Sequence, residues 1–311
     1  MYTAEPAGLV RTVLGDVPPD ALGAMLIHEH LLTAPPAYAV HQDPDLEFGT
    51  AEGAEKEVAD LVRAGGGGLV ELTTADYGRD VTAAVAAARA TGAHIVQGTG
   101  LQKGSYYPAG TSRRTSEELA AGFVDDIRAG FGPENTRAGA IKVGTCSTEE
   151  VWEVERKVLE AAAIAAKATG APILTHTQAG RLGHEQLDVF ESAGLDLGQV
   201  CVGHLDRNLE ADYLFSLARR GAWLGLDQWT KDKYGPDAER AAMVRRLVDA
   251  GHTRVMVSGD LGRGSYQRVY GGSPGLGACL DAIRRALGDE LAELTLVANP
   301  ARFLAFKEVT R

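Results

Sequence analysis

The chain has 311 residues, of which 45% are hydrophobic and 23% are charged, and its formal net charge is -11. An acidic chain has no electrostatic reason to follow a phosphate backbone or an anionic membrane surface, which argues against nucleic-acid and membrane partners. No uninterrupted apolar run approaches the roughly 20 residues of a membrane span. The first residues, Met1 to Pro6, lack a basic stretch followed by an apolar one, so no signal peptide is expected.

The cysteines are sparse. Cys146, Cys201 and Cys279 are widely spaced and form no C-x-x-C motif. An odd, scattered set argues against a disulfide framework and suits a reducing compartment. We therefore expect a cytoplasmic protein with free thiols.

The N-terminal part predicts a short hairpin or lid ahead of the first core strand. Residues 9–14 and the turn 15–19 form this hairpin, and the strand spans 23–28. A loop rich in Pro and Asp follows, and then a helix over about 52–64 ends at the glycine run 65–68. That run follows a helix and precedes a strand, the reverse of the order in a phosphate-binding P-loop.

From there one unit recurs, an apolar strand followed by a loop and an alanine-rich helix. The further predicted strands are 69–73, 94–98, 139–143, 172–176, 200–204, 223–226 and 254–258, the helices are 80–90, 116–129, 149–169, 183–193, 209–220, 236–250 and 275–287, and 291–306 forms two short closing helices. Continuous apolar strands are typical of strands buried on both faces. Eight such units predict a slightly distorted (β/α)8 TIM barrel, a single domain over 1–311. A doubly wound open sheet is the alternative, but no G-x-G-x-x-G fingerprint follows the first strand.

Two histidines end the first predicted strand, in the sequence Leu26-Ile27-His28-Glu29-His30. Side chains at i and i+2 of an extended segment point to the same face, so both imidazoles can aim at one point. Converging imidazoles suit a borderline metal such as zinc. A lone His-x-His is a weak signal, because one of the two could be an ordinary hydrogen-bonded polar residue.

Other strands end in similar side chains, and active sites of barrels lie at these C-terminal ends. The further candidates are Lys142, His176, His204 and Asp260. Each has an ordinary explanation by itself: the lysine could snorkel out of the barrel, a histidine could bond to backbone, and the aspartate could cap a helix. The remaining histidines, His41, His94, His184 and His252, fall in loops, helices or a strand start. That contrast favours a metal centre.

Six such side chains exceed the needs of one tetrahedral ion, so we predict two divalent ions. Zinc is expected, and cobalt, manganese or iron would also suit these ligands. Two neighbouring cations need an anionic bridge. A desolvated lysine amine loses its proton readily and can react with carbon dioxide to form a carbamate, which would make Lys142 that bridge.

The ordered set of candidates resembles the phosphotriesterase-like branch of the amidohydrolase superfamily over essentially the whole chain. Supporting stretches are Gly78-Arg79-Asp80, Gly98-Thr99-Gly100, Gly203-His204-Leu205-Asp206 and Asn299-Pro300-Ala301-Arg302-Phe303. The resemblance implies a binuclear metal hydrolase in which His28, His30 and Asp260 bind the more buried ion. His176 and His204 would bind the more exposed one, and carboxylated Lys142 would bridge both with a hydroxide. The resemblance also favours a homodimer.

The loops after the seventh and eighth strands are basic and aromatic. Arg263, Tyr266 and one of Lys231 or Lys233 could cradle a substrate phosphate remote from the reacting bond. Solvent-facing loops also collect basic residues without any binding role. The segment after Gly100 places Tyr106 or Tyr107 near the mouth, without an assigned role.

We therefore predict a metal-dependent lactonase or carboxylesterase for a small, anionic or phosphorylated substrate. A metal-bridging hydroxide would attack the ester-like bond, and Asp260 would accept and return the proton. A phosphotriesterase (aryldialkylphosphatase) or an amidase with the same centre is the alternative. A barrel that binds a ligand without turnover is a third, and metal analysis separates it from the enzymes.

Overall fold

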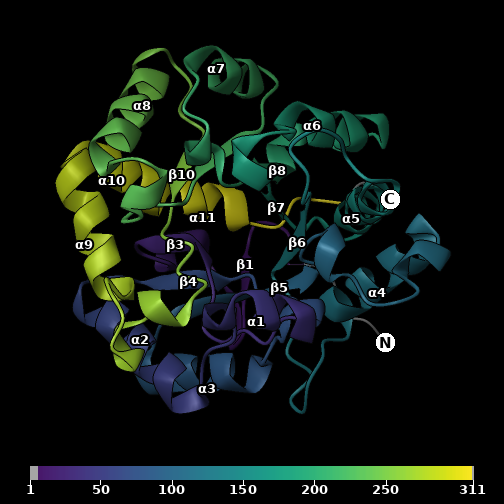
Figure 1. The fold of residues 1–311 in the computed structure, drawn as a ribbon, viewed down its shortest axis with the longest axis horizontal. Helices are drawn as coiled ribbons and strands as arrows, with labels where there is room; N and C mark the ends of the chain where they lie inside the picture. Colours follow the sequence, from purple (N-terminus) through teal and green to yellow (C-terminus); the bar gives the residue numbers. More distant parts are fainter. Residues whose placement is uncertain (1–5, 310–311) are drawn as a thin grey trace.

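A computed structural model describes residues 6–309 and confirms the predicted barrel. Eight parallel strands occupy its centre with helices around them (Figure 1). In chain order the strands are β3 (Met25–Glu29), β4 (Gly68–Glu71), β5 (His94–Gly100), β6 (Ala140–Gly144), β7 (Ile173–His176), β8 (Val200–Val202), β9 (Trp223–Leu226) and β10 (Val255–Val257). Each pairs with its neighbour in sequence, as successive β–α units require.

The predicted helices are present, with small shifts at their ends. They are α2 (Ala51–Arg63), α3 (Val81–Thr91), α4 (Ser116–Arg128), α5 (Glu153–Thr169), α6 (Gly183–Ser192), α7 (Ala211–Arg219), α8 (Asp237–Asp249) and α9 (Leu276–Leu287). Helix α5 starts four residues later than predicted, and the Glu155 side chain accepts the backbone N–H of Trp152 at this start. An unpredicted helix, α1 (Ala37–Gln42), begins after Pro36 in the Pro- and Asp-rich loop. The closing segment forms α10 (Asp289–Ala292) and α11 (Asn299–Leu304), joined by a π-helical turn.

Apolar side chains of the strands fill two separate layers. One set packs between strands and helices, and the other fills the barrel interior. The interior set is Met25, Ile27, Val70, Leu72, Val96, Ala140, Leu174, Cys201, Trp223 and Met256, with Val10, Leu22, Phe303 and Leu304. These side chains fill the interior of the barrel with an apolar core. Polar side chains are left the end of the barrel where the strands finish.

The seam between the first and last strands is irregular. Among the described residues, β3 and β10 form no ladder, although their backbones are linked by other hydrogen bonds. The Asp260 N–H donates to the His28 carbonyl at 3.0 Å, and the Ser258 hydroxyl accepts the His28 N–H at 3.1 Å. Two metal-ligand candidates therefore lie at the distorted seam of the barrel.

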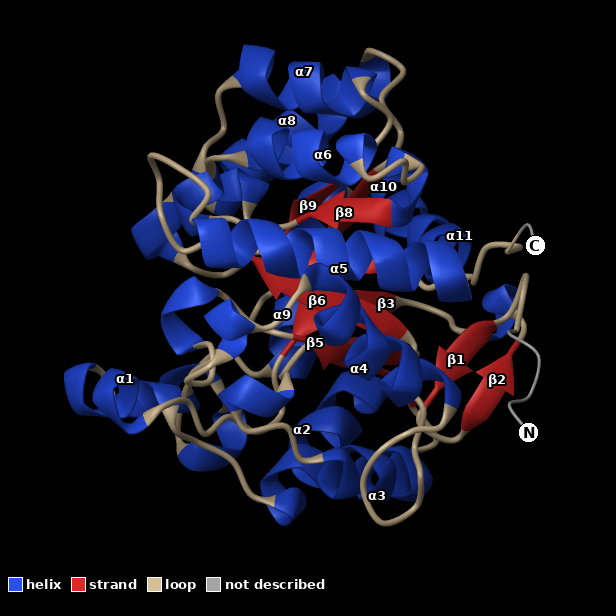
Figure 2. Ribbon diagram, turned by 90° about the vertical axis from the view of Figure 1, so that its right-hand side faces the viewer, coloured by secondary structure: helices blue, strands red, loops and turns tan. Residues whose placement is uncertain are grey.

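The N-terminal hairpin consists of β1 (Val10–Thr12) and β2 (Gly15–Val17). It lies at the end of the barrel opposite α1 (Figure 2). The expectation that this segment is a lid is therefore wrong, because Val10 packs into the interior core at the closed end. Residues 15–17, expected as a turn, are the second strand of the hairpin.

Three further expectations concern the cysteines, membrane spans and a signal peptide. All three cysteines are free, as predicted. No helix within residues 6–309 is long and apolar enough to cross a membrane. Residues 1–5, on which most of the signal-peptide expectation rests, lie outside the described part of the chain.

Candidate metal centre

Lys142 and His176 reach the barrel interior by ordinary strand alternation. Ala140 and Leu174 belong to the interior core, and Lys142 and His176 follow two residues later on the same faces. Strands β6 and β7 pair in regular parallel register, with Gly144 opposite His176. The Lys142 amine is completely buried and lies 2.8 Å from the His28 Nε2 atom. The lysine therefore points into the histidine cluster rather than out of the barrel.

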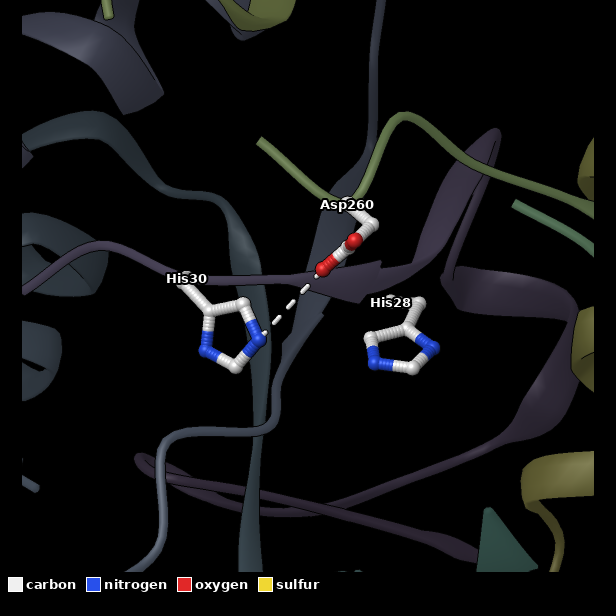
Figure 3. A group of neighbouring side chains, drawn as sticks. All are labelled: His28, His30 and Asp260. Carbon is white, nitrogen blue, oxygen red and sulfur yellow. Dashed lines mark ion pairs between the residues drawn. The ribbon is translucent and has the colours of Figure 1, made fainter. Parts of the chain in front are cut away.

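His28 and His30 do not follow simple alternation. Leu26 packs in the outer layer, so regular pleating would send residues 28 and 30 outward as well. The pairing of β3 with β4 shifts register between Leu26 and Glu29, and this bulge turns the following side chains. His28, His30 and Asp260 then approach one another closely, with ligand atoms within 4.8 Å (Figure 3).

His204 and Asp260 lie beyond their strands, in left-handed backbone. Strand β8 ends at Val202 and β10 at Val257, so neither residue ends a strand as predicted. Their φ angles are +58° and +46°. Left-handed backbone is unusual for non-glycine residues and persists where surrounding structure holds it, often at functional sites.

These six side chains form one connected cluster. The His28 ring stacks on His204 with centroids 4.6 Å apart, and His176 contacts His204 edge-on at 4.5 Å. The His30 Nε2 atom lies 3.5 Å from Asp260 Oδ1. The structure thus brings together all the residues predicted as metal ligands.

Buried side-chain oxygen atoms contact the Nδ1 atoms of three of the imidazoles. Asp227 contacts the Nδ1 atoms of both His28 and His204 at 2.7 Å, and Thr73 Oγ1 lies 2.8 Å from His30 Nδ1. Partners of this kind set the tautomer and orientation of metal-binding histidines and leave Nε2 to coordinate. Although burial opposes ionisation of Asp227, the adjacent His204 and His28 imidazoles hold its pKa below the usual range.

Two buried glutamates fix the strand ends around the cluster. Glu29 accepts the Ser258 hydroxyl and the Gly259 and Leu261 N–H groups, at 2.6–2.8 Å. Glu71 accepts the N–H groups of Leu31 and Thr73. Burial raises the pKa of each glutamate to about 7. These contacts hold the backbone on either side of Asp260 and His30.

The donor set fits divalent metal ions. Burial, with a smaller effect from Lys142, lowers the pKa of His28 to about 4, and burial also lowers the pKa of His30 and His176. These imidazoles are therefore neutral near pH 7, the form that coordinates a metal. Burial lowers the Lys142 pKa to about 8, so a substantial fraction of the amine is uncharged under mild conditions.

Asp260 has two polar partners besides the histidines. Its Oδ2 atom accepts Gln228 Nε2 at 2.7 Å and the Lys231 ammonium at 3.1 Å. Burial would raise the Asp260 pKa, but Lys231 and the neighbouring imidazoles hold it well below its usual range. The carboxylate is therefore ionised and oriented at the edge of the cluster.

The cluster opens into a small polar cavity of about 220 Å³. Its wall includes His30, His176, His204 and Asp260, together with Leu46, Tyr77, Gln102, Lys103, Tyr106, Gln178, Arg207, Gln228, Lys231, Tyr234, Gly262, Arg263 and Tyr266. Within this lining Leu46 is the one aliphatic side chain. Such a cavity suits a small polar molecule better than a large apolar one.

The predicted substrate-binding residues occupy different positions. Arg263 and Tyr266 line the cavity, and Arg263 pairs with Asp43. Lys231 lines it too, but its ammonium bonds Asp260 and Gln228. Lys233 is outside the lining and lies over the Tyr234 and Tyr266 rings.

Of the two tyrosines expected near the mouth, Tyr106 lines the cavity and Tyr107 does not.

Several other site residues were missed by reading the sequence. Asp227 directly follows β9, and Lys103 follows β5, so a search of every strand end would have found both. Arg207 comes three residues after His204. Thr73 and Gln228 carry no sequence signal of their own.

The fold and site define a class of protein, a parallel α/β barrel whose open end gathers histidines and carboxylates able to hold metal ions. Residues 8–304 match the model of the phosphotriesterase family. The chain belongs to this family of metal-dependent hydrolases.

Individual relatives agree with this assignment. The phosphotriesterase homology protein of Escherichia coli is 34% identical over 255 residues, covering 81% of this chain and 86% of the relative. The N-acetyltaurine hydrolase of Bos taurus is 29% identical, covering 97% and 99%. A crystal structure of a lactonase from Listeria monocytogenes superposes with a TM-score of 0.90 at 29% identity, covering 96% of this chain and all of that one.

Proposed function

We propose that this protein hydrolyses the ester-like bond of a small polar substrate, most simply a lactone, with two divalent metal ions bound by the buried cluster. The observation that carries the proposal is the convergence of five side-chain nitrogen donors and one carboxylate in one buried cluster, four members of which line a polar cavity. His28, His30 and Asp260 would hold one ion, and His176 and His204 the other. Lys142, as a carbamate, would bridge them.

When bound, the ions supply Lewis acidity that activates water at neutral pH and polarises a carbonyl group. The residues of the chain then have separate tasks. Asp227 and Thr73 hold the imidazoles in position. Asp260, kept ionised by Lys231, would accept the proton of the attacking water and return it to the leaving oxygen.

The lining of the cavity supports a lactone or ester over an apolar phosphotriester. A phosphotriester carries several apolar groups and no ionised phosphate, and Leu46 is the one aliphatic residue in the described lining. We propose that Arg263 and Tyr266 contact the substrate. The Listeria relative is a lactonase, which points to the same substrate class.

Amide hydrolysis is the second candidate. The Bos taurus relative, aligned over nearly the whole chain, is an N-acetyltaurine hydrolase. N-acetyltaurine is an amide with a terminal sulfonate, and the basic lining of the cavity would suit such an anion. Water activated at the same cluster would attack the carbonyl carbon of an amide as well as that of a lactone.

Metal analysis and a substrate panel test this proposal. Purified protein should contain about two divalent ions per chain, as expected for a binuclear site. It should hydrolyse small lactones faster than aryl dialkyl phosphates, and a chelator should abolish this activity until a divalent ion is restored. Protein that holds no metal and hydrolyses no lactone, ester or N-acetyltaurine would contradict the proposal.

A further inference from the structure

One imidazole of the cluster is held at the opposite nitrogen from the other three. Side-chain oxygens contact the Nδ1 atoms of His28, His30 and His204. In His176, by contrast, the Nε2 atom lies 3.2 Å from the Oε1 atom of Gln178. Among the described residues, no hydrogen-bond or ion-pair partner contacts the Nδ1 atom of His176. The free nitrogen of this ring is therefore Nδ1.

We propose that Gln178 is a positioning residue of the metal centre: its side-chain oxygen accepts the Nε2 proton of His176, so that the Nδ1 lone pair of this ring binds a divalent ion. A neutral imidazole carries one proton, and the nitrogen that donates a hydrogen bond leaves the other nitrogen as the metal ligand. The inference rests on the proposed function, because the ion is the one assigned there to His176 and His204.

The orientation of the Gln178 amide decides whether His176 can be a ligand at all. If the amide nitrogen faced His176, it would occupy the Nε2 lone pair, and the ring proton would lie on Nδ1. Neither nitrogen would then coordinate an ion. With the oxygen toward His176, as in the structure, Nε2 carries the proton and Nδ1 is free. A metal-binding His176 thus requires the amide orientation that the structure has.

The two ring nitrogens without a polar partner belong to adjacent rings. The Nε2 atoms of His28 and His30 already have polar neighbours within the cluster. Among the described residues, the bare nitrogens that remain are Nε2 of His204 and Nδ1 of His176. These two rings contact each other edge-on, with centroids 4.5 Å apart. They are the two rings assigned to one ion.

The surroundings of His176 favour a neutral ring. The side chain is buried, and no carboxylate among the described residues forms an ion pair with it. A protonated imidazole in this position would be a buried charge without a counterion. The ring therefore keeps one proton, and the hydrogen bond to Gln178 decides which nitrogen carries it.

Hydrogen bonds fix the backbone that carries His176 and Gln178. The His176 carbonyl accepts the side-chain amide of Gln186 at 2.8 Å. Between the two residues, the Thr177 hydroxyl donates to the Gly203 carbonyl at 2.7 Å. The contact between the two side chains is therefore part of an ordered segment, as expected for a partner that orients a metal ligand.

Gln178 contacts a ligand of one ion, whereas Asp227 contacts ligands of both. The Asp227 carboxylate contacts His28 and His204, one proposed ligand of each ion. Among the described ligand candidates, Gln178 forms a hydrogen bond only to His176. Loss of the Gln178 amide should therefore weaken one ion and leave the other, which separates this residue from a general support of the cluster.

The tautomer of His176 can be measured in protein freed of metal by a chelator. Long-range proton–nitrogen NMR spectra of the full chain with isotope-labelled histidine distinguish protonated from bare ring nitrogens, and His176→Asn identifies the signals of this ring. Gln178→Met removes the acceptor, and Gln178→Glu retains an oxygen acceptor. The matched control is Gln102→Met, because Gln102 lines the same cavity and, among the described residues, has no hydrogen bond to an imidazole.

The wild type should show His176 protonated on Nε2, and Gln178→Glu and Gln102→Met should keep this pattern. In Gln178→Met neither tautomer is held by an acceptor, so the signals should indicate a mixture of the two. A merely structural role of Gln178 would not move the proton from one ring nitrogen to the other.

Zinc affinity supplies the second readout. Each metal-free protein is titrated with zinc in competition with a chelator, which resolves two dissociation constants. Gln178→Met should raise one of them by about 10- to 100-fold, the usual loss when a residue that orients a metal-binding histidine is replaced, and change the other less than about 2-fold. Gln178→Glu should bind both ions at least as tightly as the wild type, and Gln102→Met should match the wild type.

Other outcomes overturn the inference. A wild-type His176 protonated on Nδ1 would mean that the amide presents its nitrogen to the ring. An unchanged tautomer in Gln178→Met would mean that Gln178 does not set it, and equal weakening of both ions would assign Gln178 a general supporting role. If the wild type binds no zinc, the proposed function fails, yet the spectra of the metal-free protein still decide whether Gln178 directs the His176 proton.

Discussion

Two parts of the barrel deliver their side chains to the cluster in different ways. Strands β6 and β7 position Lys142 and His176 by regular pleating alone. Around the seam, by contrast, His28 depends on a register shift, and His204 and Asp260 depend on left-handed backbone. The regular part needs only correct strand pairing. The irregular part needs buried carboxylates, Glu29, Glu71 and Asp227, to hold a conformation that local preferences disfavour.

The same contrast extends to the loops. Six described non-glycine residues have left-handed φ angles, and five of them follow β7, β8, β9 or β10. They are Ala179, Leu182, His204, Thr230 and Asp260. Unfavourable backbone thus concentrates at the open end of the second half of the barrel, where the cavity lies, as expected where function competes with stability.

The strongest test of the regular part is Lys142→Ala. The variant removes the proposed bridging ligand, so metal content should fall and kcat/KM should drop by more than about 100-fold. This loss exceeds the one expected when a residue that only orients a metal ligand is replaced. Metal analysis and steady-state kinetics measure both. The neighbouring Val143, which faces the helices, provides the control. Val143→Ala should lower the free energy of unfolding and leave the metals bound; metal loss in both variants would contradict the assignment.

The irregular part is tested by Asp227→Asn. The amide cannot replace a carboxylate that contacts two imidazoles. Metal affinity should therefore fall by about 10- to 100-fold, the usual loss when a residue that hydrogen-bonds a metal-binding histidine is replaced. Competition with a chelator measures it. Asp196→Asn, a change at a loop carboxylate that caps a short turn, is the control. Unchanged affinity in Asp227→Asn would show that the histidines keep their orientation without it.

Uptake of metal by stripped protein should depend on pH through Lys142. Its pKa is lowered to about 8, so the uncharged amine, the form that reacts with carbon dioxide, becomes more abundant as pH rises. At constant dissolved carbon dioxide, the rate of reconstitution should increase about 8-fold from pH 7 to pH 8.5, following the fraction of neutral amine. A rate independent of both pH and carbon dioxide would argue against the carbamate.

The smallest expected effect concerns a left-handed residue without a ligand role. Ala179 has φ +55°, so Ala179→Gly should relieve steric strain and raise the free energy of unfolding by about 0.5–1 kcal/mol. Ala86, exposed in α3, is the matched control. Ala86→Gly should lower the free energy of unfolding by about 0.5–1 kcal/mol, the cost of glycine in a helix. Chemical denaturation measures both, and equal losses would mean that residue 179 is not strained.

Much of the fold was readable from the sequence, because buried parallel strands are short apolar runs and the helices between them are periodic. All eight strands and their helices were predicted, with errors mainly at the ends. Helix α1 was missed because its loop has the composition of a turn. The sequence of the hairpin is compatible with a lid because it does not reveal which end of the barrel the hairpin packs against.

The sequence by itself determined which side chains could meet, since polar residues after apolar strands must gather at one end of a parallel barrel. Only the tertiary structure decided how they meet. The bulge in β3 and the left-handed residues are stabilised by partners such as Glu29 and Asp227, distant in the chain. The same holds for charge. Among the described residues Lys231 and Arg263 form ion pairs and Lys103 and Arg207 do not, because pairing depends on which loops pack together.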